Sequence, residues 1–138
     1  MAPELLTRDI RGEEISLRTL QGQVVLLDFW ASWCRPCIQV LPDLKALYRR
    51  EARRGLALIG VSLDADVAVL TATIQRYGME WPQVWDESGL DGSLAQRYGV
   101  QAIPTAILID KQGRIFAAGR FPFSTLTRYV RFLLEQST

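Results

Sequence analysis

The chain has 138 residues, a net charge of +1, 49% hydrophobic residues and no histidine. This length can bury a full core without metal or disulfide staples, so we expect one domain over residues 1–138. The small net charge excludes a general attraction to nucleic acid or to anionic membranes, and no stretch approaches the roughly 20 apolar residues of a membrane span.

The first residues, Met1–Glu4, do not resemble a signal peptide, and we interpret residues 1–4 as a remnant of a linker or of cloning. If the parent protein is exported or tethered to a membrane, its leader has been removed from this sequence. Residues 4–17 have the pattern of a hairpin with a turn at Asp9–Gly12. A simpler interpretation, which we prefer, is a strand that extends the edge of the sheet.

The next segment, Val24–Trp30, is apolar and begins with β-branched residues, which predicts a buried strand. It contains one carboxylate, Asp28, six residues before Cys34. Because burial penalises the charged form of a carboxyl, we expect the pKa of Asp28 to be raised. Its carboxyl could then accept or return the proton of Cys37.

The two cysteines of the chain, Cys34 and Cys37, follow this strand in Cys-x-x-Cys spacing, and a helical pattern begins directly after them. Pro36 suits the first turn of a helix, because that turn needs no N–H. Free N–H groups at the start of the helix, together with the cation of Arg35, favour the thiolate form of Cys34. Cys37 lies one turn further on, close enough to form a disulfide with Cys34.

Other roles for the cysteine pair are weaker. Structural zinc needs four ligands, usually from cysteine and histidine, and no further residues of these types are present. Covalent haem attachment needs a histidine after the second cysteine, where this chain has Ile38. A purely structural disulfide in so small a ring stabilises little. The pair therefore indicates redox chemistry that needs no metal and no organic cofactor.

The helix after the cysteines is predicted from about Arg35 to Arg53, with a kink at Pro42. The arginine cluster at residues 49–54 lacks interleaved aromatic residues, so we interpret it as a solvated helix end and not as a nucleic-acid site. The nearly all-apolar run Leu56–Leu63 predicts a central strand that is covered on both faces.

Asp64 is expected to cap a helix over residues 66–77. We interpret Trp81 and Trp85 as core residues beneath this layer, with contact to a partner as the alternative. Further on, Leu90–Tyr98 has the pattern of a short helix.

The end of the chain predicts a hairpin and a helix. Thr105–Asp110 and Arg114–Ala118 flank a turn and favour two antiparallel strands. Ser124 is expected to cap a final helix that ends near Glu135.

The segment Asp28–Cys37 reads Asp-Phe-Trp-Ala-Ser-Trp-Cys-Arg-Pro-Cys and closely resembles the active-site segment of thioredoxin-fold oxidoreductases. Tyr98–Thr105 is similar to the cis-proline loop of that fold. The opening segment Asp9–Gly22, an insertion around residues 64–92 and the segment Leu108–Gly113 resemble the TlpA/ResA-like branch. The resemblance covers nearly the whole chain.

This resemblance implies an α/β fold: a single thioredoxin-like domain with a central mixed β-sheet flanked by helices, an N-terminal hairpin-like extension and a central αβ insertion. It also implies a cis peptide bond before Pro104, packed against the cysteines. The backbone of Ile103 would then be free to pair with an extended substrate. An apolar collar would surround Cys34. The substrate-binding residues that we expect are Trp33, Arg35, Pro36, Ile103 and Pro104.

Two positions depart from the relatives. ResA-like proteins have an acidic residue three positions after the second cysteine, where this chain has Val40. Thioredoxins commonly have a lysine near the buried aspartate on the next strand, and the matching position here is Gly60. With no cation to offset its charge, Asp28 should have a high pKa.

The sequence therefore predicts a thiol–disulfide oxidoreductase with the catalytic residues Cys34, Cys37 and Asp28. Since no histidine separates the cysteines, we expect a reducing protein, with a potential on the order of −200 to −280 mV. Its partners would be disulfide-containing protein clients and an upstream thiol reductant, and we expect a monomer. By resemblance it would act in the bacterial periplasm or cell envelope, for example in cytochrome c biogenesis or copper-site assembly, with the cytoplasm as the alternative.

Three alternatives stay open. A thiol peroxidase of the same fold would resemble Pro-x-x-x-Thr-x-x-Cys, but this chain has Leu27, Trp30 and Cys34 at those positions. A redox-inert domain could use the apolar collar only to hold client chains. The chain could also be one domain of a longer fusion protein.

Overall fold

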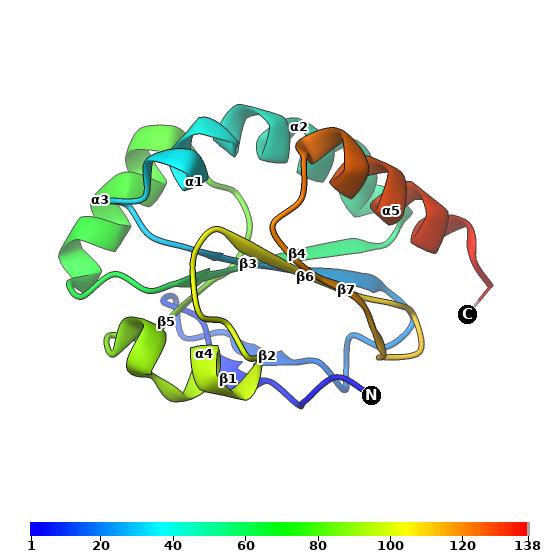
Figure 1. Ribbon diagram of the computed structural model, residues 1–138, viewed down its shortest axis with the longest axis horizontal. Helices are drawn as coiled ribbons and strands as arrows, with labels where there is room; N and C mark the ends of the chain where they lie inside the picture. Colours follow the sequence, from blue (N-terminus) through cyan, green and yellow to red (C-terminus); the bar gives the residue numbers. More distant parts are fainter. Residues whose placement is uncertain (138) are drawn as a thin grey trace.

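Strand β3 (Val24–Trp30) lies at the centre of the molecule (Figure 1). In the computed structural model, which describes residues 1–137, it is the middle strand of a five-stranded sheet with the order β5-β4-β3-β6-β7. β3 runs parallel to β4 and antiparallel to β6, so the sheet is mixed, as predicted. The other strands are β4 (Leu56–Ser62), β5 (Gln83–Trp85), β6 (Thr105–Ile109) and β7 (Ile115–Gly119).

Both faces of the sheet are covered, because successive side chains of a strand point to opposite sides. Leu26 and Trp30 belong to the core under one layer of helices, whereas Leu27 and Phe29 belong to the core on the other face. The first layer contains α1 (Arg35–Gln39), α2 (Leu41–Glu51), α3 (Val67–Tyr77) and α5 (Phe123–Glu135) (Figure 1). The opposite face carries α4 (Ser93–Arg97) and a hairpin of β1 (Leu6–Arg8) and β2 (Glu14–Ser16).

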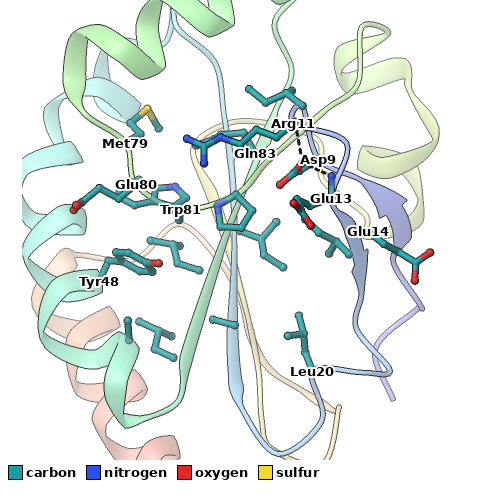
Figure 2. A pocket seen from close by; sticks show the side chains of 18 of the residues that line it. Asp9, Arg11, Glu13, Glu14, Leu20, Tyr48, Met79, Glu80, Trp81 and Gln83 are labelled. Atoms are coloured by element: carbon teal, nitrogen blue, oxygen red, sulfur yellow. Dashed lines mark hydrogen bonds between the residues drawn. The ribbon is translucent and has the colours of Figure 1, made fainter.

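The N-terminal hairpin does not extend the edge of the central sheet. β1 and β2 pair antiparallel in a separate two-stranded sheet, so our preference for an edge strand was wrong. Leu5 and Ile15 are buried in the second core, and this burial holds the hairpin against the face of the sheet. The turn of the hairpin reaches β5, where the N–H of Ile10 donates to the carbonyl of Gln83 at 2.9 Å. Figure 2 shows this turn beside Gln83.

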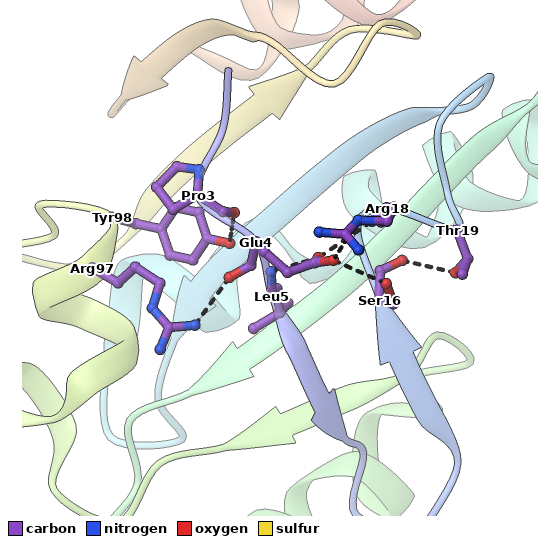
Figure 3. A network of polar contacts seen from close by, with 8 residues as sticks. All are labelled: Pro3, Glu4, Leu5, Ser16, Arg18, Thr19, Arg97 and Tyr98. Carbon is purple, nitrogen blue, oxygen red and sulfur yellow. Dashed lines mark hydrogen bonds and ion pairs between the residues drawn. The ribbon is translucent and has the colours of Figure 1, made fainter.

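The residues ahead of β1 are also tied to the fold (Figure 3). The hydroxyl of Tyr98 donates to the carbonyl oxygen of Pro3 at 2.6 Å, and Arg97 Nη1 donates to that of Glu4 at 2.9 Å. The carboxylate of Glu4 accepts from the N–H of Arg18 at 3.2 Å. Residues 3 and 4 therefore connect α4 to the segment that follows the hairpin.

The single kinked helix predicted after the cysteines is wrong, because the chain forms two helices, α1 and α2, that meet at Val40. Pro42 lies in the first turn of α2, where its missing N–H removes no helical hydrogen bond. A continuous helix would instead press its ring against the carbonyl of Ile38. The second helix ends in a 3₁₀ turn at Ala52–Arg54.

Helix α3 and strand β5 form the expected αβ insertion, which lies between β4 and α4 in the chain. The cap of α3 is Asp66, whose carboxylate accepts from the N–H of Ala68 at 2.8 Å; Asp64 does not cap this helix. Trp81 is buried and its ring centroid lies 5.6 Å from that of Tyr48, which confirms its interpretation as a core residue.

Two further helix predictions need correction. The helix predicted over Leu90–Tyr98 is a 3₁₀ turn at Gly89–Asp91 followed by α4, separated by Gly92 in an extended conformation. The final helix begins at Phe123, so Ser124 lies inside its first turn and is not its cap.

Candidate active site

Cys34 and Cys37 form a disulfide at the start of α1, directly after the loop that follows β3. Cys34 is the N-cap residue, and its Sγ accepts from the N–H of Cys37 at 3.3 Å. Pro36 lies in the first turn of the helix, as the sequence predicts. A sulfur that already accepts a backbone N–H is better able to carry negative charge after reduction.

Both cysteines are enclosed in the disulfide form. Cys34 is 5% exposed and Cys37 is 2% exposed, and both belong to the core under the helices. The sulfur of Cys34 is therefore not open to solvent while the disulfide is formed. The neighbouring Trp33, in contrast, is 67% exposed. Arg35 and Pro36 are also exposed, so the surface around the disulfide combines apolar groups with one cation.

The loop before β6 is the second part of the site. The peptide bond between Ile103 and Pro104 is cis. Ile103 is half-buried and packs against both cores. Pro104 shares a cavity of about 330 Å³ with Pro36 and Asp28, so the structure brings the proline loop, the start of α1 and β3 together.

Asp28 is the ionisable group of β3 and faces this cavity. Burial raises the pKa of Asp28 from 3.8 to about 7. The direction agrees with the prediction made from a carboxyl in an apolar strand. A carboxyl with this pKa exists in both protonation states near neutral pH, which suits it to proton transfer.

No cation from the neighbouring strands offsets the charge of Asp28, because it lies opposite Gly60 of β4 and Ala106 of β6. The carboxamide of Gln83 occupies the space that a Cβ at residue 60 would need. Oε1 of this carboxamide accepts from Nε1 of Trp30 at 2.9 Å. The space that a lysine would need at residue 60 is therefore filled by an uncharged amide.

Asp64 is a buried carboxylate near the site, although its place in the sequence predicted a helix cap. It is 2% exposed and accepts from the N–H of Ser32 at 3.0 Å and from its hydroxyl at 2.5 Å. It also accepts from the hydroxyl of Ser62 at 2.7 Å, and its carbonyl accepts from Nε1 of Trp85. These bonds tie the loop ahead of Cys34 to the end of β4. The signal available in the sequence was a lone carboxylate directly after a buried strand.

Two general properties complete the description of residues 1–137. In this part of the chain, no group of three or more His, Cys, Asp or Glu side chains is placed to hold a metal ion. None of the helices in the described range combines the length and the apolar character that a membrane crossing requires.

Known proteins with similar sequences are named thiol-disulfide oxidoreductases. The chain is 32% identical over 114 residues to the thiol-disulfide oxidoreductase ResA of Bacillus thuringiensis, covering 83% of this chain and 64% of the relative. It is 34% identical over 114 residues to the ResA protein of Halalkalibacterium halodurans, with coverage of 83% and 63%. The match thus spans less than two thirds of the length of these relatives.

Solved structures confirm the predicted thioredoxin-like fold. A thiol-disulfide oxidoreductase from Bacteroides fragilis superimposes with a TM-score of 0.84 at 30% identity, covering 96% of this chain and 98% of that one. The thioredoxin domain of a thiol-disulfide oxidoreductase from Bacteroides vulgatus gives a TM-score of 0.83 at 26% identity, with coverage of 96% and 94%.

A family model described as the AhpC/TSA family matches residues 1–118. This range contains all of the sheet except the last residue of β7, both cysteines and the cis-proline loop. Together with the similar sequences and structures, it shows that the chain belongs to the AhpC/TSA family of thioredoxin-fold proteins.

Proposed function

We propose that this protein is a thiol–disulfide oxidoreductase that reduces disulfides of other proteins through Cys34 and Cys37. The observation that carries the proposal is the disulfide at the start of α1, next to a cavity that holds a carboxyl with a pKa of about 7. The names of the similar proteins, which are thiol-disulfide oxidoreductases, support it.

The reaction proceeds in two exchange steps that start from the reduced protein. The Cys34 thiolate attacks one sulfur of the client disulfide, the client S–S bond breaks, and one client sulfur leaves as a thiolate that takes up a proton. The Cys37 thiolate then attacks Sγ of Cys34 and releases the second client thiol. Two electrons have passed to the client, and the Cys34–Cys37 disulfide must be reduced again by an upstream dithiol.

Asp28 serves as the proton acceptor for Cys37 in the second step. A thiol must lose its proton before it attacks, and an ordinary cysteine with a pKa of about 8.5 is mostly protonated at neutral pH. Because burial raises the pKa of Asp28 to about 7, its carboxylate is a base of suitable strength. The shared cavity gives this carboxyl access to water through which the proton can leave.

Client chains bind over the exposed surface around the disulfide. Trp33 offers a large exposed apolar surface, and Pro36, three residues further along the chain, is exposed as well. The backbone of Ile103, before the cis bond, pairs with an extended segment of the client, and Pro104 shapes the cavity below. Arg35 adds a cation that favours the Cys34 thiolate.

The location and the partners follow from the resemblance to the TlpA/ResA-like branch. We place the protein in the bacterial periplasm or cell envelope, as a monomer built from one domain over residues 1–138. Its clients are disulfide-containing proteins, including those of cytochrome c biogenesis. A thiol reductant returns the Cys34–Cys37 pair to the dithiol.

Insulin reduction with dithiothreitol tests the activity. Wild-type protein should accelerate the precipitation of the insulin B chain, and Cys34→Ser should show only the background rate. Equal rates for both proteins would favour the redox-inert binding domain instead. Peroxide consumption measured in parallel distinguishes the thiol peroxidase, since the proposed oxidoreductase should consume no peroxide beyond its dithiol content.

The role of Asp28 is tested by the pH dependence of turnover. Asp28→Asn should slow turnover at neutral pH, where Cys37 needs a base, and the deficit should shrink as the pH approaches the pKa of a free thiol. The variant Asp43→Asn, at the exposed wall of the same cavity, is the matched control. Unchanged turnover of Asp28→Asn from about pH 6 to about pH 9 would refute the proton-transfer role.

A further inference from the structure

A second, larger cavity of about 560 Å³ lies along the first half of β4 (Figure 2). It is lined by four consecutive residues of this strand, Leu56–Ile59, whose side chains point alternately to both faces of the sheet. A cavity that touches both faces of one strand runs along its edge. Helix α2 forms one wall and the β2 hairpin forms the other. Pro82, the residue before β5, also lines the cavity. We call this cavity the β4-edge groove.

The groove exists because β5 is too short to cover the edge of β4. The two strands pair only at residues 60–62 of β4. The N–H of Gly60 donates to Pro82 and the carbonyl of Ser62 accepts from Asp86, so the even-numbered residues of β4 direct their backbone groups toward β5. By the alternation of a strand, the N–H and carbonyl groups of Leu56 and Leu58 point to the same edge. None of the strands in the described part of the chain covers them there.

Two buried side-chain donors in the walls of the groove also lack partners. Within residues 1–137, Nε1 of Trp81 and Nε2 of Gln83 make no hydrogen bond, and each residue is only 3% exposed. Figure 2 shows both residues at the upper end of the groove. A buried donor without a partner is unfavourable, so an acceptor supplied by a ligand would be favourable. A peptide backbone supplies such acceptors at regular intervals.

The rim of the groove is acidic. Four carboxylates line it, from Asp9, Glu13, Glu14 and Glu80, against the single guanidinium of Arg11. Asp9 accepts backbone N–H groups of its own turn, and Glu80 is paired with Arg49 at 2.8 Å. The exposed carboxylate of Glu13, on the hairpin side, is left to attract cations, whereas Figure 2 shows the carboxylate of Glu14 turned away from the groove. The α2 side is apolar and contains Tyr48, Ile74, Met79 and Trp81.

We propose that the β4-edge groove binds an extended polypeptide segment in which apolar and basic residues alternate. The segment adds as a strand to Leu56–Ile59 and continues the line of β5, with its apolar side chains toward α2 and its lysines or arginines toward the hairpin at Glu13. A second copy of this chain fits less well, because two acidic hairpin rims would then face each other.

This surface lies apart from the disulfide, although Gln83 belongs to both regions: it lines the groove, and its carboxamide fills the space at Gly60, opposite Asp28. None of its lining residues lines the cavity of Asp28, and it follows the start of β4, whereas the cysteines follow the end of the parallel strand β3. The groove therefore acts as an anchor for a partner chain at a distance from the disulfide. Its occupancy and the redox activity can be measured independently.

The binding test uses a fluorescein-labelled peptide of roughly eight residues that alternates lysine with valine or threonine. Fluorescence anisotropy should report binding by the oxidised wild-type protein. An analogue with glutamate in place of lysine should bind at least about tenfold more weakly. An analogue with the same charges but N-methylated at alternate amides should lose affinity by about tenfold, since it cannot form the edge hydrogen bonds.

Two double variants with the same charge change locate the site. Glu13→Gln/Glu14→Gln should weaken binding by about fivefold, whereas Glu87→Gln/Glu135→Gln, which does not touch the groove, should leave it unchanged. Both pairs are exposed, so folding is preserved. Equal weakening by the two variants would overturn the proposal, because it would indicate a general electrostatic attraction.

Amide hydrogen exchange followed by NMR tests the strand addition residue by residue. In the free protein, the amides of Leu56 and Leu58 should exchange much faster than those of Ala57 and Ile59, which face β3. Peptide should slow the exchange at Leu56 and Leu58 selectively. Absence of peptide binding, or binding without this protection, would overturn the proposal. So would slow exchange at Leu58 in a free protein that sediments as a dimer, which would identify a second copy as the occupant.

Discussion

The most direct consequence of the Asp28 environment is a pH-dependent stability that one substitution removes. Asp28→Asn keeps the shape and polarity of the side chain but cannot ionise. In the folded protein burial raises the pKa of Asp28 to about 7, whereas the unfolded chain has the ordinary value of 3.8. Below about pH 4 the carboxyl is protonated in both states, so folding carries no charge penalty there.

The size of the penalty follows from the two pKa values. Between about pH 4 and about pH 7 the unfolded chain loses its proton first, so the stability of the wild type falls relative to that of the variant. Above pH 7 the difference levels off, at about 4 kcal/mol for a shift of about three pKa units. Asp28 keeps some contact with solvent in its cavity, so this figure is an upper limit.

Urea unfolding of the oxidised proteins, followed by tryptophan fluorescence, measures this difference. The disulfide form is used because its cysteines do not titrate. Asp28→Asn should match the wild type at about pH 4 and exceed its unfolding free energy by several kcal/mol at about pH 8.5. Asp43→Asn, exposed on the wall of the same cavity, should track the wild type throughout. If the difference in unfolding free energy between Asp28→Asn and the wild type did not change between about pH 4 and about pH 8.5, burial would not raise the pKa of Asp28.

Three further substitutions test other parts of the structure. Gly60→Ala should lower the unfolding free energy by about 2–3 kcal/mol, because its Cβ displaces the carboxamide of Gln83; urea midpoints measure it. Asp64→Ala should cost about 3 kcal/mol and also slow insulin reduction, because Ser32 loses both hydrogen bonds that hold the loop ahead of the disulfide; an unchanged rate would contradict the positioning role. Lys111→Met should lower the unfolding free energy by about 1 kcal/mol, because its Nζ donates to two carbonyls at the end of α5; a slightly lower thermal midpoint would show this loss.

The local part of the candidate site was predictable from the sequence. An apolar run followed by Cys-x-x-Cys and a helical pattern placed Cys34 at a helix start, and the structure has it as the N-cap of α1. The raised pKa of Asp28 followed from one carboxyl in an apolar strand. These features depend on residues near one another in the chain, and hydrophobic periodicity reports such short-range relations.

Errors in the helices arose where two local signals compete. Pro42 can kink one helix or lie in the first turn of another. In this chain it lies in the first turn of α2, and the break between the two helices is at Val40. Asp64 and Asp66 are both suitable caps by spacing, but only Asp66 points to the start of α3. Asp64 is instead drawn into the core by Ser32 and Ser62, which no helix-capping pattern could reveal.

The sequence by itself determined the cysteine pair at a helix start, the buried carboxyl and the strands β3, β4, β6 and β7, because each is encoded by the spacing of nearby residues. Only the tertiary structure decided which groups lie opposite Asp28, where Asp64 finds its partners, and which edge of β4 is left uncovered. Strand pairing joins residues far apart in the chain, and its register is set by packing on both faces of the sheet. That packing is a property of the whole chain and cannot be read from any one segment.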